Sequence, residues 1–381
     1  MRGRDIFFVS NSVDELGGVT SWSHQMARLF TERGHGVHVV GITAPDVPQD
    51  LGGDLPYPTT TLYDVKPQKL RPVSGLRGRI DPVAACRRRA RAVGMREQAA
   101  KLSAIFRAAR PGAVVIVTQV WAMEWVVLAD TAGATVIGMS HESYEYTRRT
   151  SRYPRVLRYY PEADRMLVLT REDADLWIRH GLDNTGYMPN PLPFMPGEPS
   201  PRTEKTVASM GRLTDQKGID MLLDAWAETA PRHPGWTLRI YGAGEDEGPL
   251  RRQCTDLGLD GSVAWMGRTN DVPGALRRSS LFVQSSRGEG FPLALMEAMA
   301  TAVPCVAFDC APGVREIIRD SEDGLLAPPG NTNELARRLG QLMADQPLRD
   351  RMGEAARVNV RRYVPAEIVR RWEELFAFLE R

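Results

Sequence analysis

The chain has 381 residues, of which 43% are hydrophobic and 25% are charged, and its formal net charge is +2. This composition is typical of a globular protein and excludes a disordered chain, and the length suggests two domains. The four cysteines form neither a CxxC pair nor a zinc-finger pattern, so we expect reduced thiols. No segment has the apolar length of a signal peptide or a membrane span, so we expect a cytoplasmic protein.

The first half of the chain alternates predicted strands with predicted helices. A helix is expected to open at Gly17 and Gly18, to carry Trp22 and Phe30 on one face, and to end at Gly34. Strands are expected at 6–10, 37–42, 113–117, 135–139 and 165–169. Alternation of this kind predicts a parallel, doubly wound α/β sheet.

Positive charge is concentrated in residues 66–110. This segment carries thirteen Lys or Arg residues and only two acidic ones, Asp81 and Glu97. It can rest as a peripheral contact on an anionic membrane surface or hold a polyanionic acceptor, or it is a solvated helical face. No basic motif with interleaved aromatic residues accompanies the charge, which argues against nucleic acid.

A proline-rich segment divides the chain. Residues 188–201 contain six prolines in fourteen residues, which is typical of a stiff connector. Strands then resume, and we expect them at 206–210, 237–241, 263–266, 281–284 and 303–308. We therefore predict an N-terminal Rossmann-like domain at 1–190, a linker at 191–201, a second such domain at 202–362, and a C-terminal helix at 363–381 that packs on the first domain.

Two basic residues follow the first strand of the second half. Arg212 and Lys217 would lie at the C-terminal end of that strand, where open α/β sheets bind their ligands. The chain has forty-four arginines and only five lysines, so Lys217 stands out as a compact point charge. Two cations at this position predict an anionic ligand.

Two glutamates bracket a predicted helix start in the stretch RGEGFPLALMEA. Proline near a helix start leaves free N–H groups that bind phosphate, and Pro292 is so placed. Glu297 would lie about 7.5 Å along the axis, within reach of the hydroxyls of an attached ribose. Glu289 precedes the phosphate position and would meet the group beyond it. Each glutamate alone is more simply a surface charge, but with Arg212 and Lys217 the pair predicts a nucleoside diphosphate linked to a sugar.

Two features of the first half could contribute to the same site. The Gly17–Gly18 pair joins a strand to a helix start, where the backbone could approach the diphosphate, although such a pair is often only a tight turn. His141 follows the predicted strand at 135–139, a position that favours a ligand contact over a structural role. We expect the other five histidines to be structural.

These motifs resemble those of the GT-B glycosyltransferases of family 4 over nearly the whole chain. The E-x7-E motif of that family is similar to Glu289–Glu297, and its G-R-L-x-x-x-K-G element to residues 211–218. Its N-terminal G-G-V loop and the later R-G-H are similar to residues 17–19 and 33–35. The resemblance implies two Rossmann-like domains.

The resemblance also implies roles for individual residues. Arg212 and Lys217 would neutralise the donor diphosphate, Glu297 would hold the ribose, Glu289 would contact the donor sugar, and His141 would touch that sugar.

Backbone groups complete the implied donor site. The amides of Gly290, Phe291 and Leu293 would bind phosphate or sugar, and the backbone near Arg268 would read the nucleobase. Pro292 departs from many relatives and provides no amide of its own.

The activity implied is the retaining transfer of a hexose or N-acetylhexosamine from a nucleotide sugar, with UDP expected, and with no cofactor or metal. The expected acceptors are a cell-envelope glycan, a teichoic-acid-type polymer or a lipid-linked saccharide. A nucleotide-sugar epimerase and a noncatalytic binding protein are alternatives on the same fold. A metal-dependent transferase would need an acidic D-x-D, and Asp173–Asp175 has that form, but Thr170 and Asp173 fit a helix cap better.

Overall fold

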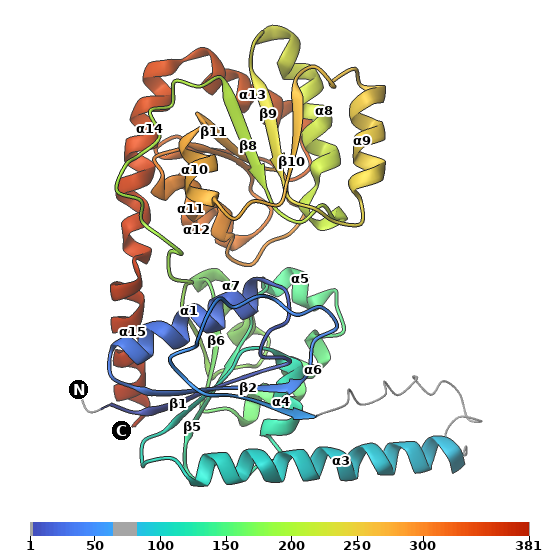
Figure 1. The fold of residues 1–381 in the computed structure, drawn as a ribbon, viewed down its shortest axis with the longest axis vertical. Coiled ribbons are helices and arrows are strands. Elements are labelled where there is room, and N and C mark those ends of the chain that lie inside the picture. The colour runs from blue at the N-terminus through green and yellow to red at the C-terminus, as the bar shows by residue number, and fades with distance from the viewer. Residues whose placement is uncertain (1–2, 64–81, 381) are drawn as a thin grey trace. The chain divides into compact units, whose positions relative to one another are not determined.

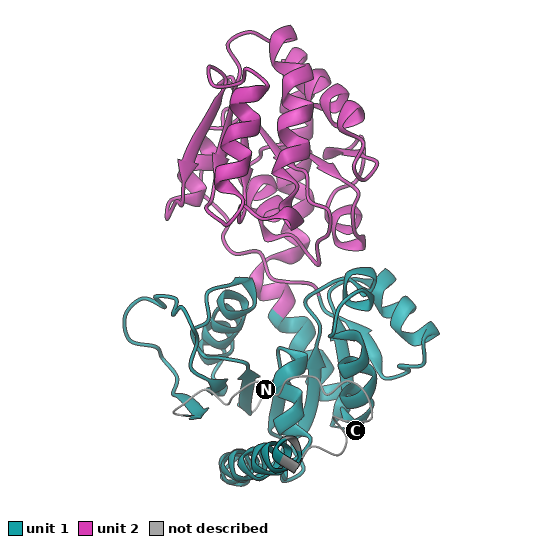
Figure 2. Ribbon diagram, turned by 90° about the vertical axis from the view of Figure 1, so that its right-hand side faces the viewer, with its two compact units in different colours: residues 1–188, 369–381 teal, residues 189–368 magenta. Residues whose placement is uncertain are grey.

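The computed structural model describes residues 3–63 and 82–380 and divides the chain into two compact units (Figure 2). Unit 1 comprises residues 1–188 and 369–381, and unit 2 comprises residues 189–368. Residues 66–81 of the basic segment lie outside the described residues. No helix in the described ranges combines the length and apolarity needed to cross a membrane.

Unit 1 contains a seven-stranded parallel sheet. In spatial order its strands are β3 (Thr59–Tyr63), β2 (Gly36–Thr43), β1 (Asp5–Ser10), β4 (Val114–Val117), β5 (Thr135–Met139), β6 (Arg165–Val168) and β7 (Thr185–Tyr187). Strand β4 reads VVIV and is buried along its length, as expected where helices cover both faces of a parallel sheet. The order reverses direction between β1 and β4, which makes this pair the topological switch point.

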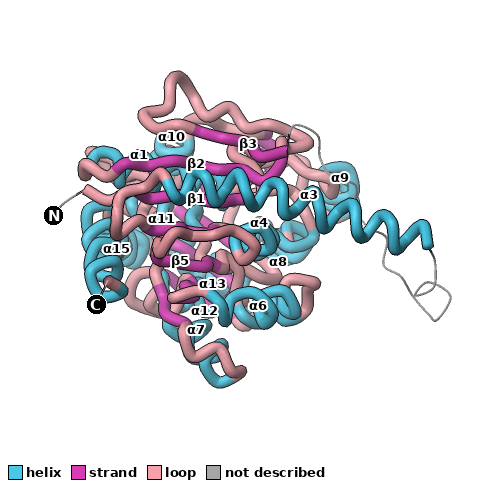
Figure 3. The backbone as a smooth tube through the Cα atoms, turned by 90° about the horizontal axis from the view of Figure 1, so that it is seen from below, coloured by secondary structure: helices cyan, strands magenta, loops and turns pink. Residues whose placement is uncertain are grey.

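Helices cover the sheet of unit 1 (Figures 1 and 3). They are α1 (Gly18–Glu32), α3 (Pro82–Arg107), α4 (Val120–Val126), α5 (Tyr144–Arg148), α6 (Tyr153–Tyr159) and α7 (Arg171–Arg179). The core between helices and sheet includes the fully buried indoles of Trp125 and Trp177. The first half of α3 extends past the sheet, and its described side chains before Arg91 are exposed.

Unit 2 repeats the topology with six strands. In spatial order they are β10 (Val263–Gly267), β9 (Thr237–Tyr241), β8 (Thr206–Met210), β11 (Leu281–Gln284), β12 (Cys305–Phe308) and β13 (Gly324–Ala327), all parallel. Its helices are α8 (Ile219–Thr229), α9 (Glu247–Asp256), α10 (Val272–Arg277), α11 (Leu293–Ala300), α12 (Pro312–Ile317), α13 (Thr332–Ala344) and α14 (Gln346–Asn359). The switch point lies between β8 and β11.

The last helix, α15 (Pro365–Leu379), crosses from unit 2 to unit 1. Trp372 is fully buried, with ring centroids 6.3 Å from Trp22 and 6.2 Å from Phe30. Arg33 donates to Glu373 through Nη2 at 2.8 Å and holds the pKa of that carboxyl below its usual range. Residues 369–379 of this helix belong to unit 1.

Most predicted strands are present with bounds within two residues, and the doubly wound α/β class is confirmed. Three short strands were not predicted, namely β3, β7 and β13. The predicted helix start at 290–292 is also corrected, because α11 begins at Leu293 and Pro292 occupies its N-cap position.

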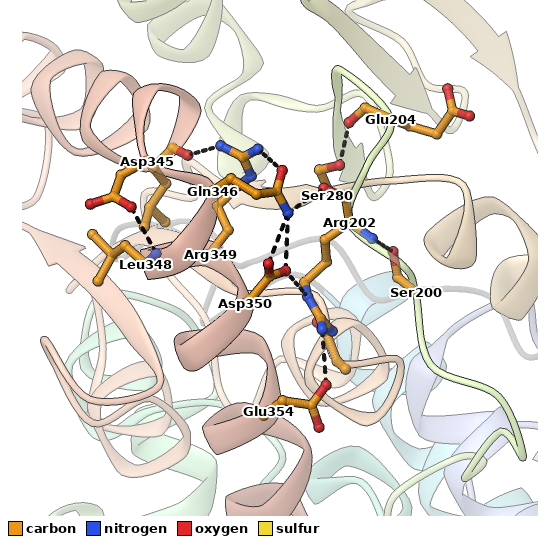
Figure 4. A network of polar contacts seen from close by, with 12 residues as sticks. Ser200, Arg202, Glu204, Ser280, Asp345, Gln346, Leu348, Arg349, Asp350 and Glu354 are labelled. Carbon is orange, nitrogen blue, oxygen red and sulfur yellow. Dashed lines mark hydrogen bonds and ion pairs between the residues drawn. The ribbon is translucent and has the colours of Figure 1, made fainter.

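A polar network fixes the end of the proline-rich segment to unit 2 (Figure 4). Arg202 donates from Nε to Asp350 at 3.0 Å and from Nη2 to Glu354 at 2.9 Å, both on α14. Its Nη1 donates to the carbonyl of Ala302 at 2.9 Å, and its backbone N–H donates to Ser200. These contacts place the end of the segment 191–201 within unit 2 rather than free of it.

Candidate functional site

Unit 2 has a small pocket at its switch point. Its volume is about 220 Å³, and it lies where β8 and β11 end. The lining residues include Gly211, Lys217, Ser286, Glu289, Phe291 and Leu293. Four residues predicted for the site line this pocket: Lys217, Glu289, Phe291 and Leu293.

A charged pair forms the polar wall of this pocket. Lys217 Nζ lies 2.6 Å from Glu289 Oε1, and Ser286 Oγ donates to the same oxygen at 2.6 Å. Glu289 is 7% exposed, so its charge is held in a largely dehydrated place by two donors. Burial, with the charge of Glu289, raises the pKa of the neighbouring Cys310 thiol to about 12, so this cysteine is neutral.

A second set of contacts joins the loops that carry Lys217 and Glu289. Gln216 donates from Nε2 to the carbonyl of Gly288 at 2.9 Å and accepts from the backbone N–H of Arg287 at 2.8 Å. The Arg287 guanidinium also contacts both carboxylate oxygens of Asp220, at 2.8 and 2.6 Å, and lowers the pKa of that carboxyl. These positioning residues could not be recognised in the sequence, because their roles depend on partners about 70 positions away.

Close backbone approaches also shape the pocket. Gly218 has φ +60°, and a Cβ there would lie 2.2 Å from the carbonyl oxygen of Ser285, so only glycine fits. A Cβ at Gly313 would lie 1.9 Å from the carbonyl oxygen of Gly290. Both glycines let loops at the pocket pack directly on one another.

The first turn of α11 has no side-chain cap. Pro292 is its N-cap and forms no capping hydrogen bond, so the first N–H groups of the helix remain available to an anion. Because Leu293 and Phe291 line the pocket, the positive end of the helix dipole is directed toward it.

Glu297 lies one turn further along α11 and does not line the pocket. Its side chain is partly exposed, and no hydrogen bond to it is found among the described residues. Burial raises the pKa of Glu297 to about 7. A dehydrated carboxylate without donors is costly to ionise, so hydroxyl groups of a ligand would stabilise its charged form.

Arg212 and Arg268 are not brought into the pocket. Both side chains are exposed and follow β8 and β10, and neither forms an ion pair within the described ranges. Gly290 also lies outside the lining residues, one position from Phe291.

Unit 1 has a larger pocket of its own, with a volume of about 1010 Å³. Asn11, Thr118 and Ser140, which directly follow β1, β4 and β5, line its floor, and helices α4 to α6 form one wall. His141 is the one predicted site residue among its lining residues. The sequence contained a usable signal here, since each floor residue follows a predicted strand.

His141 has an apolar environment. Its ring lies edge-on to Trp22, with centroids 4.7 Å apart, and burial lowers its pKa to about 4. Within the described part of the chain, its buried Nε2 has no hydrogen-bond partner. His141 is therefore neutral at pH 7 and has one ring nitrogen free to contact a ligand.

Gly17 and Gly18 do not line this pocket, although Leu16 and Val19 on either side do. A Cβ at either glycine would meet nothing within 4 Å, and no side chain caps the start of α1. The backbone of this loop is therefore accessible to a ligand, and close packing does not require glycine at either position.

The Asp173–Asp175 alternative is resolved as a helix cap, as predicted. Thr170 accepts from the backbone N–H of Asp173 at 3.1 Å and donates to its carboxylate at 2.7 Å. The other carboxylate oxygen accepts from the backbone N–H of Tyr144 at 2.7 Å, and Asp173 is 1% exposed.

Comparison with known proteins places the chain in a family of glycosyl transferases. The family described as "Glycosyl transferases group 1" matches residues 194–359. The exopolysaccharide phosphotransferase SCO2592 of Streptomyces coelicolor is 38% identical over 259 residues, which cover 66% of this chain and 27% of that protein. An uncharacterized glycosyltransferase of Haemophilus influenzae is 32% identical over 237 residues, which cover 61% of this chain and 67% of that protein. The chain thus spans about a quarter of the length of the Streptomyces protein and about two thirds of the length of the Haemophilus protein.

A solved structure has the same fold over nearly the full length of both chains. TarM of S. aureus, determined with fondaparinux, α-GlcNAc-glycerol and UDP, superposes with a TM-score of 0.77 at 16% identity, over 98% of this chain and 99% of that one. Two parallel Rossmann-like sheets, a charged pocket at the switch point of unit 2 and these likenesses agree. The chain belongs to the group 1 glycosyl transferase family.

Proposed function

We propose that the protein transfers a hexose or N-acetylhexosamine from a nucleotide diphosphate sugar, with UDP as the expected nucleotide, to an envelope glycan. One observation carries the proposal: an uncapped helix start faces the Lys217–Glu289 pair, and Glu297, whose pKa burial raises to about 7 and which has no hydrogen-bond donor among the described residues, follows on the same helix. This arrangement suits a diphosphate between a sugar and a ribose.

In this proposal the contact between Lys217 and Glu289 is replaced by contacts of each side chain with the bound donor. Lys217 and the amides near Gly290, Phe291 and Leu293 bind the diphosphate. Glu289 accepts hydrogen bonds from hydroxyl groups of the donor sugar. Departure of the nucleoside diphosphate builds negative charge next to Lys217 and the start of α11, and both would stabilise that charge.

Three further residues of unit 2 complete the proposed donor contacts. Arg212 adds a second positive charge for the diphosphate, and its exposed side chain is free to reach it. Glu297 accepts from the ribose hydroxyls, and the backbone near Arg268 contacts the base.

Unit 1 is proposed to bind the acceptor and to contribute to donor contacts. His141 is assigned to the donor sugar because its Nε2 is buried, neutral and unpartnered among the described residues. Gly17 and Gly18 are assigned to the diphosphate because nothing packs on that turn. Unit 2, with the proline-rich segment as its connection, is proposed to hold the nucleotide.

The finer features of the reaction belong to the proposal as well. We expect retention of anomeric configuration, with Glu289 next to the reacting carbon, and no metal or cofactor. Asp173, which a metal-dependent mechanism would require, is already committed to a helix cap. The epimerase and binding-protein alternatives are not favoured, since the charged site of unit 2 is complete and the first relatives are transferases by name.

The acceptor is proposed to be a cell-envelope glycan, a teichoic-acid-type polymer or a lipid-linked saccharide in the cytoplasm or at the inner face of the membrane. Two names support this class: one relative acts on an exopolysaccharide, and TarM was solved with α-GlcNAc-glycerol and UDP. Peripheral membrane contact through residues 66–110 is an additional proposal, supported by the basic charge of that segment.

A thermal-shift screen tests the donor assignment. UDP-, GDP- and ADP-sugars are added to the wild type, to Glu297→Gln and to Glu228→Gln, a matched exposed glutamate of α8. One nucleotide class is expected to raise the melting temperature of the wild type and of Glu228→Gln, and to do so much less in Glu297→Gln. A shift that Glu297→Gln retains in full would contradict the assigned ribose contact, and no shift with any donor would contradict the proposed function.

A further inference from the structure

The pocket of unit 1 contains buried polar atoms that call for a polar ligand. Thr147 is 1% exposed and lines the pocket, and its Oγ1 has no hydrogen-bond partner within the described ranges. Glu142 Oε2 and Asn11 Oδ1, on other lining residues, are likewise buried and unpartnered there. A buried donor or acceptor without a partner costs free energy, so hydroxyl groups of a saccharide would stabilise this surface.

One wall of the same pocket carries excess positive charge. Glu124 accepts from Arg155 Nε at 3.1 Å and lies 3.6 Å from Arg91 Nη2. Two guanidinium groups therefore share one carboxylate, and all three residues line the pocket. Trp121 lines it beside them and offers an aromatic face to a sugar ring. The rest of the lining includes Glu15, Asp46 and Glu142, and Glu142 pairs with Arg152 at 3.2 Å. An anionic group of a ligand would therefore be stabilised at the wall formed by Arg91, Glu124 and Arg155 rather than elsewhere in the pocket.

The positive charge continues outside the pocket along α3. Arg87, Arg88 and Arg89 are exposed, and none forms an ion pair with another described residue. Arg87 precedes Arg91 by four residues, so the two lie on the same helix face about 6 Å apart along the axis. Arg88 precedes Arg91 by three residues and lies on that face as well, whereas Arg89, two residues before Arg91, faces away from it. Since Arg91 lines the pocket, Arg87, Arg88 and Arg91 form a basic track that runs from the exposed half of the helix into it.

The same helix is poorly suited to a membrane. Helices that lie in the lipid interface carry Leu, Phe or Trp on their apolar face. The exposed half of α3, residues 83–98, contains none of these, and its largest exposed apolar side chains are Val83 and Val93. Charge without bulky apolar groups favours a flexible, water-soluble polyanion over a lipid surface.

We propose that the basic track binds a polyanionic glycan chain, whose phosphate or carboxylate groups contact Arg87 and Arg88 and whose end enters the unit 1 pocket at Arg91. The inference rests on the proposed function in that this chain is the acceptor. It narrows the acceptor to a polymer with regularly spaced negative charges and separates it from neutral glycans and lipid-linked sugars.

Polymer binding tests the track directly. The wild type is titrated with poly(ribitol phosphate), with a polyuronate and with neutral dextran, at low and at physiological salt. The double variant Arg87→Gln, Arg88→Gln is expected to bind the two polyanions about tenfold more weakly at low salt, with a shallower salt dependence, because fewer counterions are released. Dextran should bind neither protein measurably.

A matched control separates the track from general positive charge. Two exposed arginines of unit 2, Arg232 and Arg252, are replaced together by glutamine. This control removes the same charge and should bind polyanions as the wild type does. Equal weakening in control and track variants, or unchanged binding by the track variant, overturns the proposal.

Two further readings distinguish the other outcomes. Binding to phosphatidylglycerol vesicles that exceeds binding to the polyanions, and that the track variant loses, would replace the polymer by a membrane. The donor-induced thermal shift of the wild type is recorded in parallel. A chain that binds polyanions through the track and no nucleotide sugar contradicts the proposed function and leaves the track in place.

Discussion

At the scale of single residues, Glu297 is the most informative group of the donor site. It lies on the helix whose start faces the pocket, and burial without a hydrogen-bond donor raises its pKa to about 7. Two ribose hydroxyls donate more strongly to the ionised carboxylate, both of whose oxygens accept, than to the protonated carboxyl group, so donor binding favours loss of this proton. The affinity for the donor should therefore fall as the pH is lowered through 7.

We predict that the dissociation constant of the nucleotide sugar is about 10-fold higher at pH 6 than at pH 8, since a group with a pKa near 7 is about one-tenth ionised at the lower value. Isothermal titration of the intact sugar nucleotide measures this. The intact donor is preferred to the free nucleotide because a terminal phosphate titrates near pH 6 by itself.

The control for this prediction is Glu297→Gln, which cannot ionise and should bind more weakly with no pH dependence between 6 and 8. His141 does not interfere in this range because its pKa is about 4. A wild-type dissociation constant that is equal at both pH values would show that Glu297 does not bind the ribose as an anion.

The sequence predicted the charged members of the site and missed the residues that position them. Lys217 and Glu289 could be identified because each follows a strand end with a recognisable motif. Ser286 and Gln216 could not, because a serine or a glutamine in a loop has many ordinary roles. Their function becomes visible only when the fold brings the two loops together and each side chain gains its partner.

At the scale of elements, hydrophobic runs predicted the central strands well. Strands β8, β9 and β11 have the bounds expected from their apolar sequences. The missed strand β3 reads TTTLY, with a single fully buried residue, Leu62, and follows a proline-rich stretch, so no period was visible. The strand β7 has only three residues. Edge strands of this kind are stabilised by pairing with a neighbour rather than by their own pattern.

The packing of helix α15 on unit 1 can be tested by substitution of its buried side chains. We predict that Trp372→Ala destabilises the protein by about 3–5 kcal/mol, since the indole is fully buried against Trp22 and Phe30. The matched control is Phe378→Ala on the same helix, which is 63% exposed and should cost less than about 0.5 kcal/mol. Urea denaturation followed by circular dichroism measures both. Similar losses in the two variants would refute the packing of α15 on unit 1.

At the scale of the whole molecule, the two units repeat one topology, and each has a pocket beyond the ends of its central strands. This regularity made the fold class predictable, because alternating strands and helices permit few arrangements. The pocket of unit 1 was less predictable. Its floor follows three strands, but its wall combines helices α3, α4 and α6 from distant parts of the chain, and only the fold brings Arg91, Glu124 and Arg155 together.

The transfer reaction itself tests the central claim most directly. Labelled UDP-glucose and UDP-N-acetylglucosamine are incubated with poly(ribitol phosphate) and other envelope glycans, in excess EDTA, with the wild type, Glu289→Gln and the control Glu228→Gln. We predict labelled polymer with the donor's anomeric configuration from the wild type and the control, and at least about 100-fold less from Glu289→Gln. Equal transfer by Glu289→Gln, or consumption of the donor without any glycosylated product, would contradict the account.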